Sequence, residues 1–434
     1  MAFDDVLVDG VDSINAVRWN GMITDQANKS VTSHSHDEFK VYRGSDYWYV
    51  YKEDTTYYAK NMQTGMVDYS GADFDTIMAS AVDDIAHSGF IKLGTGQFDS
   101  ATGIVCGDKP IIVEGNGWGR GGVLTDNPGT VIKTGASGAY YVLQFGAHGT
   151  TVEGAGVRNL MFLNDPANTT CLGAVDLYNT VNSFVENCYF MGFELGGAAM
   201  PAISIRGATD ETMGGWCNRA TNNHIVNPDI GILLGANANY CVIEGNQIKG
   251  SGTAGAHGIK CDGTDAPIAS PYGCYIAGNR IIDFSYNAPS RGIWIGAGSN
   301  NSGRHTILGN TFSGNYVNIE ITSGTGIGEC TLIGNVLGTA TSSKMLDSGN
   351  VQSYYYNNKN YVRENWGAIS KADGATVTHG LETTPTVVLV TGTIATEVIS
   401  VTTVGTTTFT VAIKKYNGLW ISGTTQTIYW RAWI

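Results

Sequence analysis

The chain has 434 residues, of which 58 are glycine, 42% are hydrophobic and only 15% are charged. This length and composition can bury a long core, but not as one compact globule. The formal charge of −13 argues against binding to nucleic acid or to an anionic membrane surface, and no apolar run is long enough to cross a bilayer. An acidic surface instead suits neutral or hydroxyl-rich ligands, or serves solubility alone.

Residues 1–72 are predicted to form a β-rich lead-in module. The first residues carry neither the basic start nor the apolar core of a secretory signal, so no signal peptide is expected. Two aromatic runs follow, at residues 47–51 and 56–59, separated by the polar residues 52–55. This pattern predicts a β-hairpin with a charged turn.

An α-helix is predicted over residues 73–87. Its apolar residues recur at helical spacing: Phe74, Ile77, Met78, Ala81, Val82 and Ile85. The pattern ends at Ser88 and Gly89. A helix at this place would cover the open end of the core that follows.

A Gly-Asn step recurs in the middle of the chain. Four asparagines follow a glycine and precede an apolar residue by two positions: Asn246, Asn279, Asn310 and Asn335. We interpret Asn187 and Asn223 as degenerate copies in which Glu186 and Asn222 replace the glycine, which gives spacings of 36, 23, 33, 31 and 25 residues. A shared core of about 23 residues with variable insertions is typical of a solenoid.

Short strands flank each of these asparagines. The third and fifth residues before the asparagine are apolar or buried types that alternate with polar ones, and a second strand follows after 8 to 13 residues. Several short strands per repeat, joined at Asn or Gly corners, predict an all-β fold, a parallel β-helix over residues 73–345. Each asparagine is expected to adopt a left-handed corner and to bond the same amide in the next coil, which would build an internal ladder.

All eight cysteines lie between Cys106 and Cys330. Four of them fall at inward-facing positions, where cysteine acts as a small apolar filler: Cys241, Cys261, Cys274 and Cys330. The sequence has no CxxC pair, which argues against zinc, and no metal site is predicted.

The composition changes toward the C-terminus. Tyrosines among residues 346–366 predict a neck, whereas threonine and valine dominate residues 367–434. Alternating runs at residues 386–390 and 408–413 predict a C-terminal β-sandwich. Its tryptophans are expected in the core or in subunit contacts, with stacking on sugar rings as the alternative.

Two parts of the chain resemble known proteins. The predicted helix and the runs at residues 89–98 and 111–118 are similar to the opening of the pectin lyase-like superfamily, in particular its phage tailspike and surface polysaccharide depolymerase members. This resemblance covers about residues 70–345 and implies a right-handed parallel β-helix with an N-terminal capping helix. Residues 374–381 and 429–433 are similar to a C-terminal module of viral β-helices. In tailspikes such ends commonly trimerise, so the resemblance implies a homotrimer.

Chemistry on a β-helix is expected in its outward columns, because equivalent residues of neighbouring coils stack about 4.8 Å apart. The alternation in the strands after each corner predicts two such columns. The first holds Asp176, Ser204, Leu233, Lys260, Trp294 and Glu320. The second holds Tyr178, Arg206, Gly235, Asp262, Gly296 and Thr322. Together they place charged side chains beside an aromatic platform.

We predict four catalytic residues: Lys260, Asp262, Asp265 and Glu320. A hydrolase would use two of the carboxyl groups as acid and as base or nucleophile, and the backbones of Asp262 and Glu320 are expected on the order of 10–12 Å apart. A lyase would instead use Lys260, Arg206 or Arg291. The alternative to both is that these are ordinary solvated side chains of an outer sheet.

Four further residues are predicted to bind substrate: Asp176, Arg206, Trp216 and Trp294. Trp216 lies in one of three insertions, at residues 208–219, 250–258 and 262–272, which are expected to wall one stretch of the solenoid. Packing against a neighbouring subunit is the rival role for both tryptophans.

The predicted function is that of a viral tailspike-like protein that binds and cleaves a host surface polysaccharide. Since the pectin lyase-like superfamily includes lyases, hydrolases, esterases, epimerases and inactive members, its fold does not settle the chemistry. Two alternatives stay open, a non-catalytic β-helical protein of a virion and a secreted polysaccharide lyase or hydrolase. No cofactor is predicted, although the sequence leaves calcium open. The expected location is the virion surface or the extracellular space.

Overall fold

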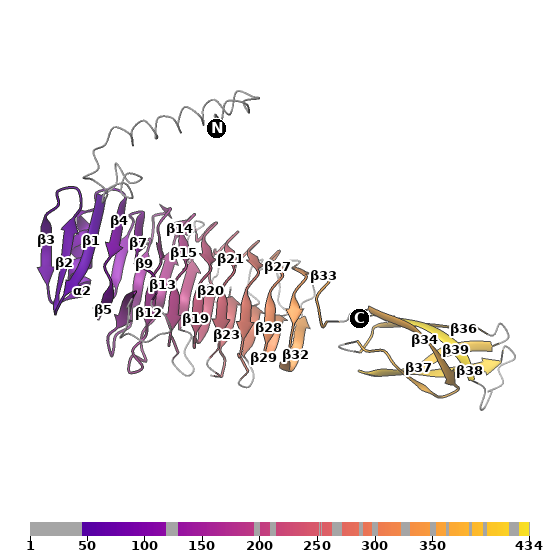
Figure 1. The fold of residues 1–434 in the computed structure, drawn as a ribbon. Helices are drawn as coiled ribbons and strands as arrows, with labels where there is room; N and C mark the ends of the chain where they lie inside the picture. The colour runs from indigo at the N-terminus through magenta and orange to yellow at the C-terminus, as the bar shows by residue number, and fades with distance from the viewer. Residues whose placement is uncertain are drawn as a thin grey trace, which may run out of the picture. The chain divides into compact units, whose positions relative to one another are not determined.

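The computed structural model describes residues 46–118, 129–194, 200–208, 214–250, 252, 254–262, 271–285, 290–296, 303–322, 330–347, 353–361, 364–381, 384–393, 397–415 and 425–433. Beyond Asp46 they all belong to one compact unit, Tyr47–Ile434. Three long sheets of 13, nine and nine strands wind into a parallel β-helix, and two three-stranded antiparallel sheets form a C-terminal sandwich (Figure 1). The predicted fold class is confirmed.

Each complete coil gives one strand to each long sheet, which we name sheets A, B and C in the order in which the chain meets them. Sheet A has four more strands, the three antiparallel strands before the first coil and one strand after the last complete coil. Sheet A contains β3 (Val67–Gly71), β2 (Thr56–Asn61), β1 (Asp46–Glu53), β4 (Gly89–Leu93), β7 (Ile111–Glu114), β11 (Gly156–Arg158), β15 (Phe184–Glu186), β18 (Arg219–Thr221), β21 (Val242–Glu244), β24 (Tyr275–Ala277), β27 (Thr306–Leu308), β30 (Thr331–Ile333) and β33 (Tyr354–Tyr356).

Sheet B contains β5 (Gly96–Ser100), β8 (Thr130–Thr134), β12 (Met161–Leu163), β16 (Tyr189–Met191), β19 (His224–Val226), β22 (Gln247–Lys249), β25 (Arg280–Ile282), β28 (Thr311–Ser313) and β31 (Val336–Leu337). Sheet C contains β6 (Ile104–Gly107), β9 (Tyr141–Phe145), β13 (Gly173–Tyr178), β17 (Pro201–Arg206), β20 (Ile230–Leu234), β23 (His257–Cys261), β26 (Arg291–Ile295), β29 (Asn315–Ile321) and β32 (Ala340–Asp347). A further pair joins β10 (Val152–Glu153) to β14 (Thr180–Val181).

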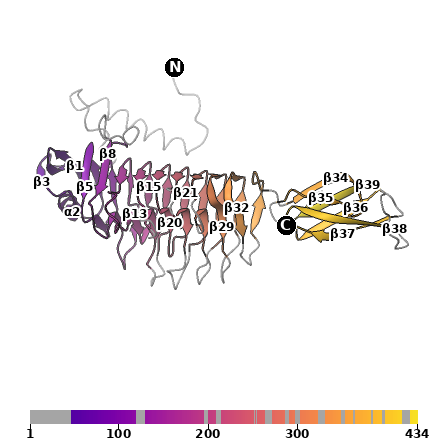
Figure 2. The same ribbon diagram turned by 90° about the horizontal axis from the view of Figure 1, so that it is seen from below.

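The predicted hairpin and helix lie at the start of the β-helix (Figure 2). Strands β1 and β2 pair antiparallel around a turn in which Asp54 has φ 53. The helix α2 (Phe74–Asp84) is shorter than predicted, because the backbone at Ile85 is already extended. Its buried face joins the first core residues of the solenoid, including Phe98, so the helix covers this end of the core as expected. Lys109 donates to the carbonyl oxygens of Val82 and Asp83, which stabilises the last helical turn.

The predicted asparagine ladder is present. In each step the side-chain Oδ1 accepts from both the backbone N–H and the side-chain Nδ2 of the preceding member, as between Asn246 and Asn279, both at 2.9 Å. The ladder runs through Asn223, Asn246, Asn279, Asn310, Asn335 and Asn358. Asn358 was not among the predicted copies.

Two details of the predicted ladder were wrong. The left-handed corner is formed by the residue before each ladder asparagine, such as Gly278 at φ 61 or Asn222 at φ 56, so the two roles belong to different residues. Asn187, at φ 52, occupies this corner position and not the ladder. The ladder position of its coil belongs to Cys188, whose N–H donates to Asn223 Oδ1 at 3.0 Å.

One continuous hydrophobic core fills the β-helix from Trp48 to Met345. The four cysteines predicted to point inward are fully buried, whereas Cys217 is exposed at a corner. In the described ranges no cluster of His, Cys, Asp or Glu could hold a metal ion, and no helix there is long and apolar enough to span a membrane.

The coils extend beyond residue 345, the predicted end of the β-helix. Strand β32 pairs with β29, and β33 pairs in register with β30, so part of the predicted neck of residues 346–366 belongs to the β-helix. The sandwich consists of β34 (Glu364–Ala372), β39 (Thr425–Trp433) and β36 (Val387–Gly392) facing β35 (Thr376–Thr378), β38 (Thr408–Lys415) and β37 (Glu397–Val404). Phe409 and Trp430 pack in its core, at 5.6 Å between ring centroids.

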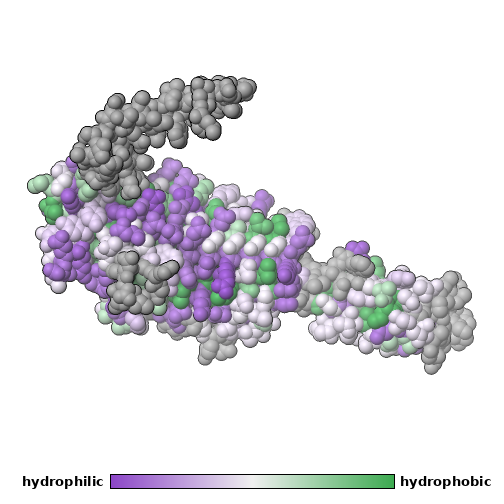
Figure 3. Space-filling view, viewed as in Figure 1, coloured by the Kyte–Doolittle hydropathy of each residue, from purple (hydrophilic) through white to green (hydrophobic). Residues whose placement is uncertain are grey.

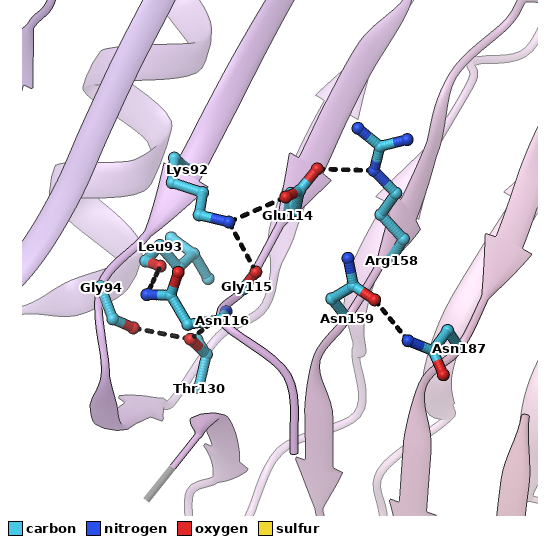
Figure 4. Close-up of polar contacts among 10 residues, drawn as sticks. All are labelled: Lys92, Leu93, Gly94, Glu114, Gly115, Asn116, Thr130, Arg158, Asn159 and Asn187. Atoms are coloured by element: carbon cyan, nitrogen blue, oxygen red, sulfur yellow. Dashed lines mark hydrogen bonds and ion pairs between the residues drawn. The ribbon is translucent and has the colours of Figure 1, made fainter. Parts of the chain in front are cut away.

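The outward column of sheet A changes character along the solenoid. In the first coils it alternates in charge, and Glu114 lies between Lys92 and Arg158, at 2.8 and 2.6 Å (Figure 4). In the last coils the same column is apolar and comprises Ala277, Leu308, Ile333 and Tyr356. The surface in Figure 3 is correspondingly more hydrophobic toward the C-terminal coils.

Candidate functional site

The outer face of sheet C brings the predicted site residues into register. The pairing of β13, β17, β20, β23, β26 and β29 aligns the first column from Asp176 to Glu320 as predicted. Tyr178 pairs with Arg206 in the second column, and backbone hydrogen bonds of Asp262, Gly296 and Thr322 to the neighbouring strands extend it. The face is therefore a flat array of side chains one coil apart.

Two residues join this face because the alternation breaks once per strand. His257 and Arg291 lie three residues before Lys260 and Trp294, an odd number that would place them on the opposite side of a regular strand. Glycines turn inward at the break. A Cβ on Gly258 would lie 2.5 Å from Ile281 of the core, and one on Gly292 would lie 2.9 Å from Phe312. His257 and Arg291 consequently reach the outer face.

Trp294 is the centre of the site. The indole is half-buried, and the His257 ring stacks on it at 5.3 Å and 16° between planes. Lys260 Nζ lies 4.9 Å from the indole centroid and 2.5 Å from Asp262 Oδ2. The indole lies over Gly296, where a Cβ would come within 3.0 Å of it. Three predicted residues, Lys260, Asp262 and Trp294, are thus brought together.

Glu320 pairs with Arg291 one coil further on. Glu320 Oε2 and Arg291 Nε form an ion pair, and each side chain is only 12% exposed. Burial lowers the pKa of the Arg291 guanidinium from its usual value. Each predicted carboxylate, Asp262 and Glu320, therefore has its own cationic neighbour.

His257 is held neutral at this site. Only 8% of the residue is exposed, and burial, with the nearby charges of Lys260 and Arg291, lowers its pKa to about 3, although Asp262 acts in the opposite direction. Its Nδ1 is buried without a hydrogen-bond partner. The imidazole adds a flat, uncharged surface behind the indole.

Arg206 and Asp176 form a separate cluster. Arg206 donates from Nε and Nη2 to the two carboxylate oxygens of Asp176, at 3.0 and 2.8 Å. Tyr178 and Tyr141 flank the guanidinium at 4.8 and 5.6 Å. Burial first, and then the charge of Asp176, raise the pKa of Tyr141 to about 12. Since Asp176 is fully buried, it holds Arg206 in place, and only Arg206 is exposed for a ligand.

One described residue of the prediction, Trp216, is not on this face. Trp216 lies at the corner before β18, where it forms a bridge with Val181 and is 42% exposed. Asp265 lies outside the described residues, as do parts of the three predicted insertions.

Sequence reasoning missed three members of the face. Counting every second residue of a strand as outward-facing excluded His257 and Arg291 from the two columns. Arg291 was nevertheless named as a residue that a lyase could use. The signal that was present is the glycine after each of them, Gly258 and Gly292, in strands otherwise rich in isoleucine. Tyr141 lies in a coil without the Gly-Asn step, and no sequence signal identified it.

No protein-family model and no curated protein matches the sequence. Similar solved structures include the tailspike protein gp49 from Acinetobacter baumannii bacteriophage Fri1, a capsular polysaccharide depolymerase, at 12% identity over 83% of this chain and 82% of that chain, with a TM-score of 0.47. Another is the tailspike protein gp49 from Pseudomonas phage LKA1, at 14% identity over 80% of this chain and 66% of that chain, with a TM-score of 0.38. An alginate lyase from Paenibacillus sp. str. FPU-7 covers 65% of this chain and 96% of its own, at 14% identity and a TM-score of 0.40. At such identities and TM-scores, these likenesses carry no function over to this chain.

Proposed function

We propose that this chain binds a surface polysaccharide along the outer face of sheet C and cleaves it there. The observation that carries the proposal is the cluster around Trp294, where an aromatic platform lies beside the ion pairs Lys260–Asp262 and Arg291–Glu320. A half-buried indole stacks on the apolar face of a pyranose ring, while charged groups one coil away reach its hydroxyl and acidic groups.

The ion pairs favour elimination over hydrolysis. Hydrolysis needs one protonated carboxylic acid to assist the leaving oxygen, and a carboxylate paired with a cation stays ionised. In an elimination, Glu320 or Asp262 would accept the proton from the carbon next to a uronate carboxyl group while Arg291 neutralises that carboxyl group. The electron pair of the broken C–H bond would form a carbon–carbon double bond as the neighbouring glycosidic C–O bond breaks, and the Lys260 ammonium would donate a proton to the leaving oxygen.

A second candidate function is binding without cleavage. It is favoured by the low exposure of both carboxylates, 9% for Asp262 and 12% for Glu320, each engaged by a cation. In that case the face would serve attachment to a polysaccharide, with Arg206 and Trp294 as contacts.

A glycan panel with three variants separates these functions. The wild-type protein is incubated with purified bacterial surface polysaccharides, and binding, reducing-end release and absorbance of unsaturated uronates are measured. We expect Asp262→Asn and Glu320→Gln to abolish cleavage without unfolding the protein. Glu186→Gln is the matched control, because Glu186 pairs with Arg219 of the next coil in the same manner on sheet A. Full cleavage by both sheet C variants would reject this site, and binding without any product would favour the second function.

We further propose that the chain is a homotrimer at a virion surface or outside the cell. The apolar outward column Ala277, Leu308, Ile333 and Tyr356 supports a subunit contact along sheet A. Mass measurement by light scattering after size exclusion tests this assembly, and a monomer would contradict it.

A further inference from the structure

In the coils from β11 to β27 the chain makes two left-handed corners and fills them differently. The corner between sheets A and B holds only asparagine or glycine in these and the later described coils: Asn159, Asn187, Asn222, Gly245, Gly278, Gly309, Gly334 and Asn357. The corner before sheet A holds Gly154, Asn182, Cys217, Tyr240, Gly273 and Arg304, with φ from 52 to 78°. Backbone hydrogen bonds from one coil to the next connect this second series, as from Tyr240 N to Tyr272 O at 2.8 Å.

The second corner is occupied against backbone preference. Left-handed φ brings Cβ close to the following carbonyl, so asparagine and glycine are favoured there and a bulky side chain is an outlier. At the corner between sheets A and B, the chain uses only asparagine or glycine for the same left-handed backbone conformation. The side chains of Tyr240 and Arg304 therefore have a role that the corner itself does not explain.

Together with two neighbouring aromatic residues they form a strip, which we call the corner strip: Trp216, Tyr240, Tyr272 and Arg304. Tyr272 is half-buried and the other three are exposed. Isolated bridges join Val181 to Trp216 and Tyr272 to both Asn239 and Gly303, so the strip follows successive coils. Tyr240 and Tyr272 meet edge to face at 5.9 Å, and the Arg304 guanidinium lies 5.7 Å from the Tyr272 centroid.

The Tyr240 ring lies against the next coil. A Cβ on Gly273 would come within 2.8 Å of one edge of the ring, so the glycine at this corner makes room for it. The rest of the ring is open to solvent, and Tyr240 is 57% exposed. A ring supported on one side and open on the other is a preformed stacking platform, and Trp216, 42% exposed, is a second one nearby along the strip.

We propose that the corner strip is a second, non-catalytic binding site for a glycan chain that runs along the solenoid. Exposed rings present faces to successive pyranose units, since one coil is about as long as one such unit, and Arg304 donates to hydroxyl or acidic groups. Tyr240 and Tyr272 touch edge to face, but the strip holds three rings beside polar corner backbone and a guanidinium, not the broad apolar centre of a protein interface. This composition favours an amphipathic sugar over a protein partner. The site is independent of cleavage on sheet C.

Tyr240→Asn tests the strip without a folding penalty, because asparagine is favoured in this conformation. Binding to dextran, pullulan, alginate and hyaluronate is measured by affinity electrophoresis at increasing polysaccharide concentration. We expect wild-type protein to be retarded by at least one of these polymers and Tyr240→Asn to bind it about tenfold more weakly, with an unchanged or higher melting temperature. The control is Tyr429→Asn, which removes a tyrosine of similar exposure, 52%, from β39 of the C-terminal sandwich and should leave binding unchanged.

The outcomes separate this site from sheet C. Retardation of Tyr240→Asn equal to wild type overturns the proposal, and so does a wild-type protein that none of the four polymers retards. Weakened binding by Tyr240→Asn supports the strip even if Asp262→Asn shows that no cleavage occurs on sheet C. Loss of binding in Asp262→Asn together with full binding in Tyr240→Asn assigns the glycan to sheet C alone.

Discussion

Replacing Asn279 by alanine tests how strongly the asparagine ladder holds the coils together. Its Oδ1 accepts from the N–H and the Nδ2 of Asn246, and its Nδ2 donates to Ile243 O and Asn310 Oδ1, all at 2.9 Å. The residue is 1% exposed, so no water replaces the side chain. Alanine leaves the Asn246 N–H buried without a partner and removes the hydrogen bonds to Asn246 Nδ2, Ile243 O and Asn310 Oδ1.

The expected loss follows from the unpaired N–H and the three further hydrogen bonds that are lost. The unpaired N–H costs about 1–3 kcal/mol and each lost hydrogen bond about 1 kcal/mol, so Asn279→Ala should lower the free energy of unfolding by about 4 kcal/mol. Asn222→Gly is the matched control, because Asn222 is exposed at the left-handed corner next to the ladder, where glycine is tolerated. It should cost less than about 1 kcal/mol.

Guanidinium unfolding followed by circular dichroism measures both variants against the wild type. A difference below about 1 kcal/mol between the two would refute the reasoning, since the ladder would then contribute no more than an exposed corner. An Asn279→Ala protein that fails to fold at all, beside a normal Asn222→Gly protein, would support it.

Three further predictions concern single side chains. Asp176→Asn should lower stability by about 3 kcal/mol in chemical unfolding, because it leaves the Arg206 guanidinium partly buried without its anion; an equally stable variant would contradict this. Tyr240→Asn should raise stability by about 1 kcal/mol through relief of the left-handed corner, and a lower melting temperature would show that the ring packs more than it strains. Since His257 has a pKa of about 3 in the folded protein, below the 6.5 of an unperturbed histidine, the unfolded chain binds the extra proton between these values. Stability should therefore fall on acidification through this range, by up to about 1.4 kcal/mol per pH unit, and His257→Gln should remove this contribution.

The coil architecture was predictable because one local pattern recurs. A glycine and an asparagine at fixed positions, with apolar residues two apart, specify both the corner and the inward face of the next strand. The prediction from the Gly-Asn pattern was wrong at Asn187. In Glu186-Asn187-Cys188 the asparagine forms the left-handed corner and the cysteine takes the ladder position. Only the register between coils, Tyr189 beside His224, shows which residue takes which role.

The site was predictable only as far as strand alternation extends. It placed Lys260, Trp294 and Glu320 in one column, and the register confirms that placement. Strand alternation missed His257 because the break at Gly258 moves the residue before it to the opposite face of the sheet. The pairing of Glu320 with Arg291 depends on side chains from different coils meeting in space, and spacing along the chain does not encode that choice.

The ladder joins residues 23 to 33 positions apart in the chain, yet its amide contacts stay between 2.9 and 3.1 Å. The residues that lengthen some coils therefore lie between the strands and do not change the spacing of the asparagines in the ladder. A gene for such a chain can gain or lose codons in those segments while the windings above and below keep their places. Selection can in this way remodel what the molecule touches without rebuilding what holds it together.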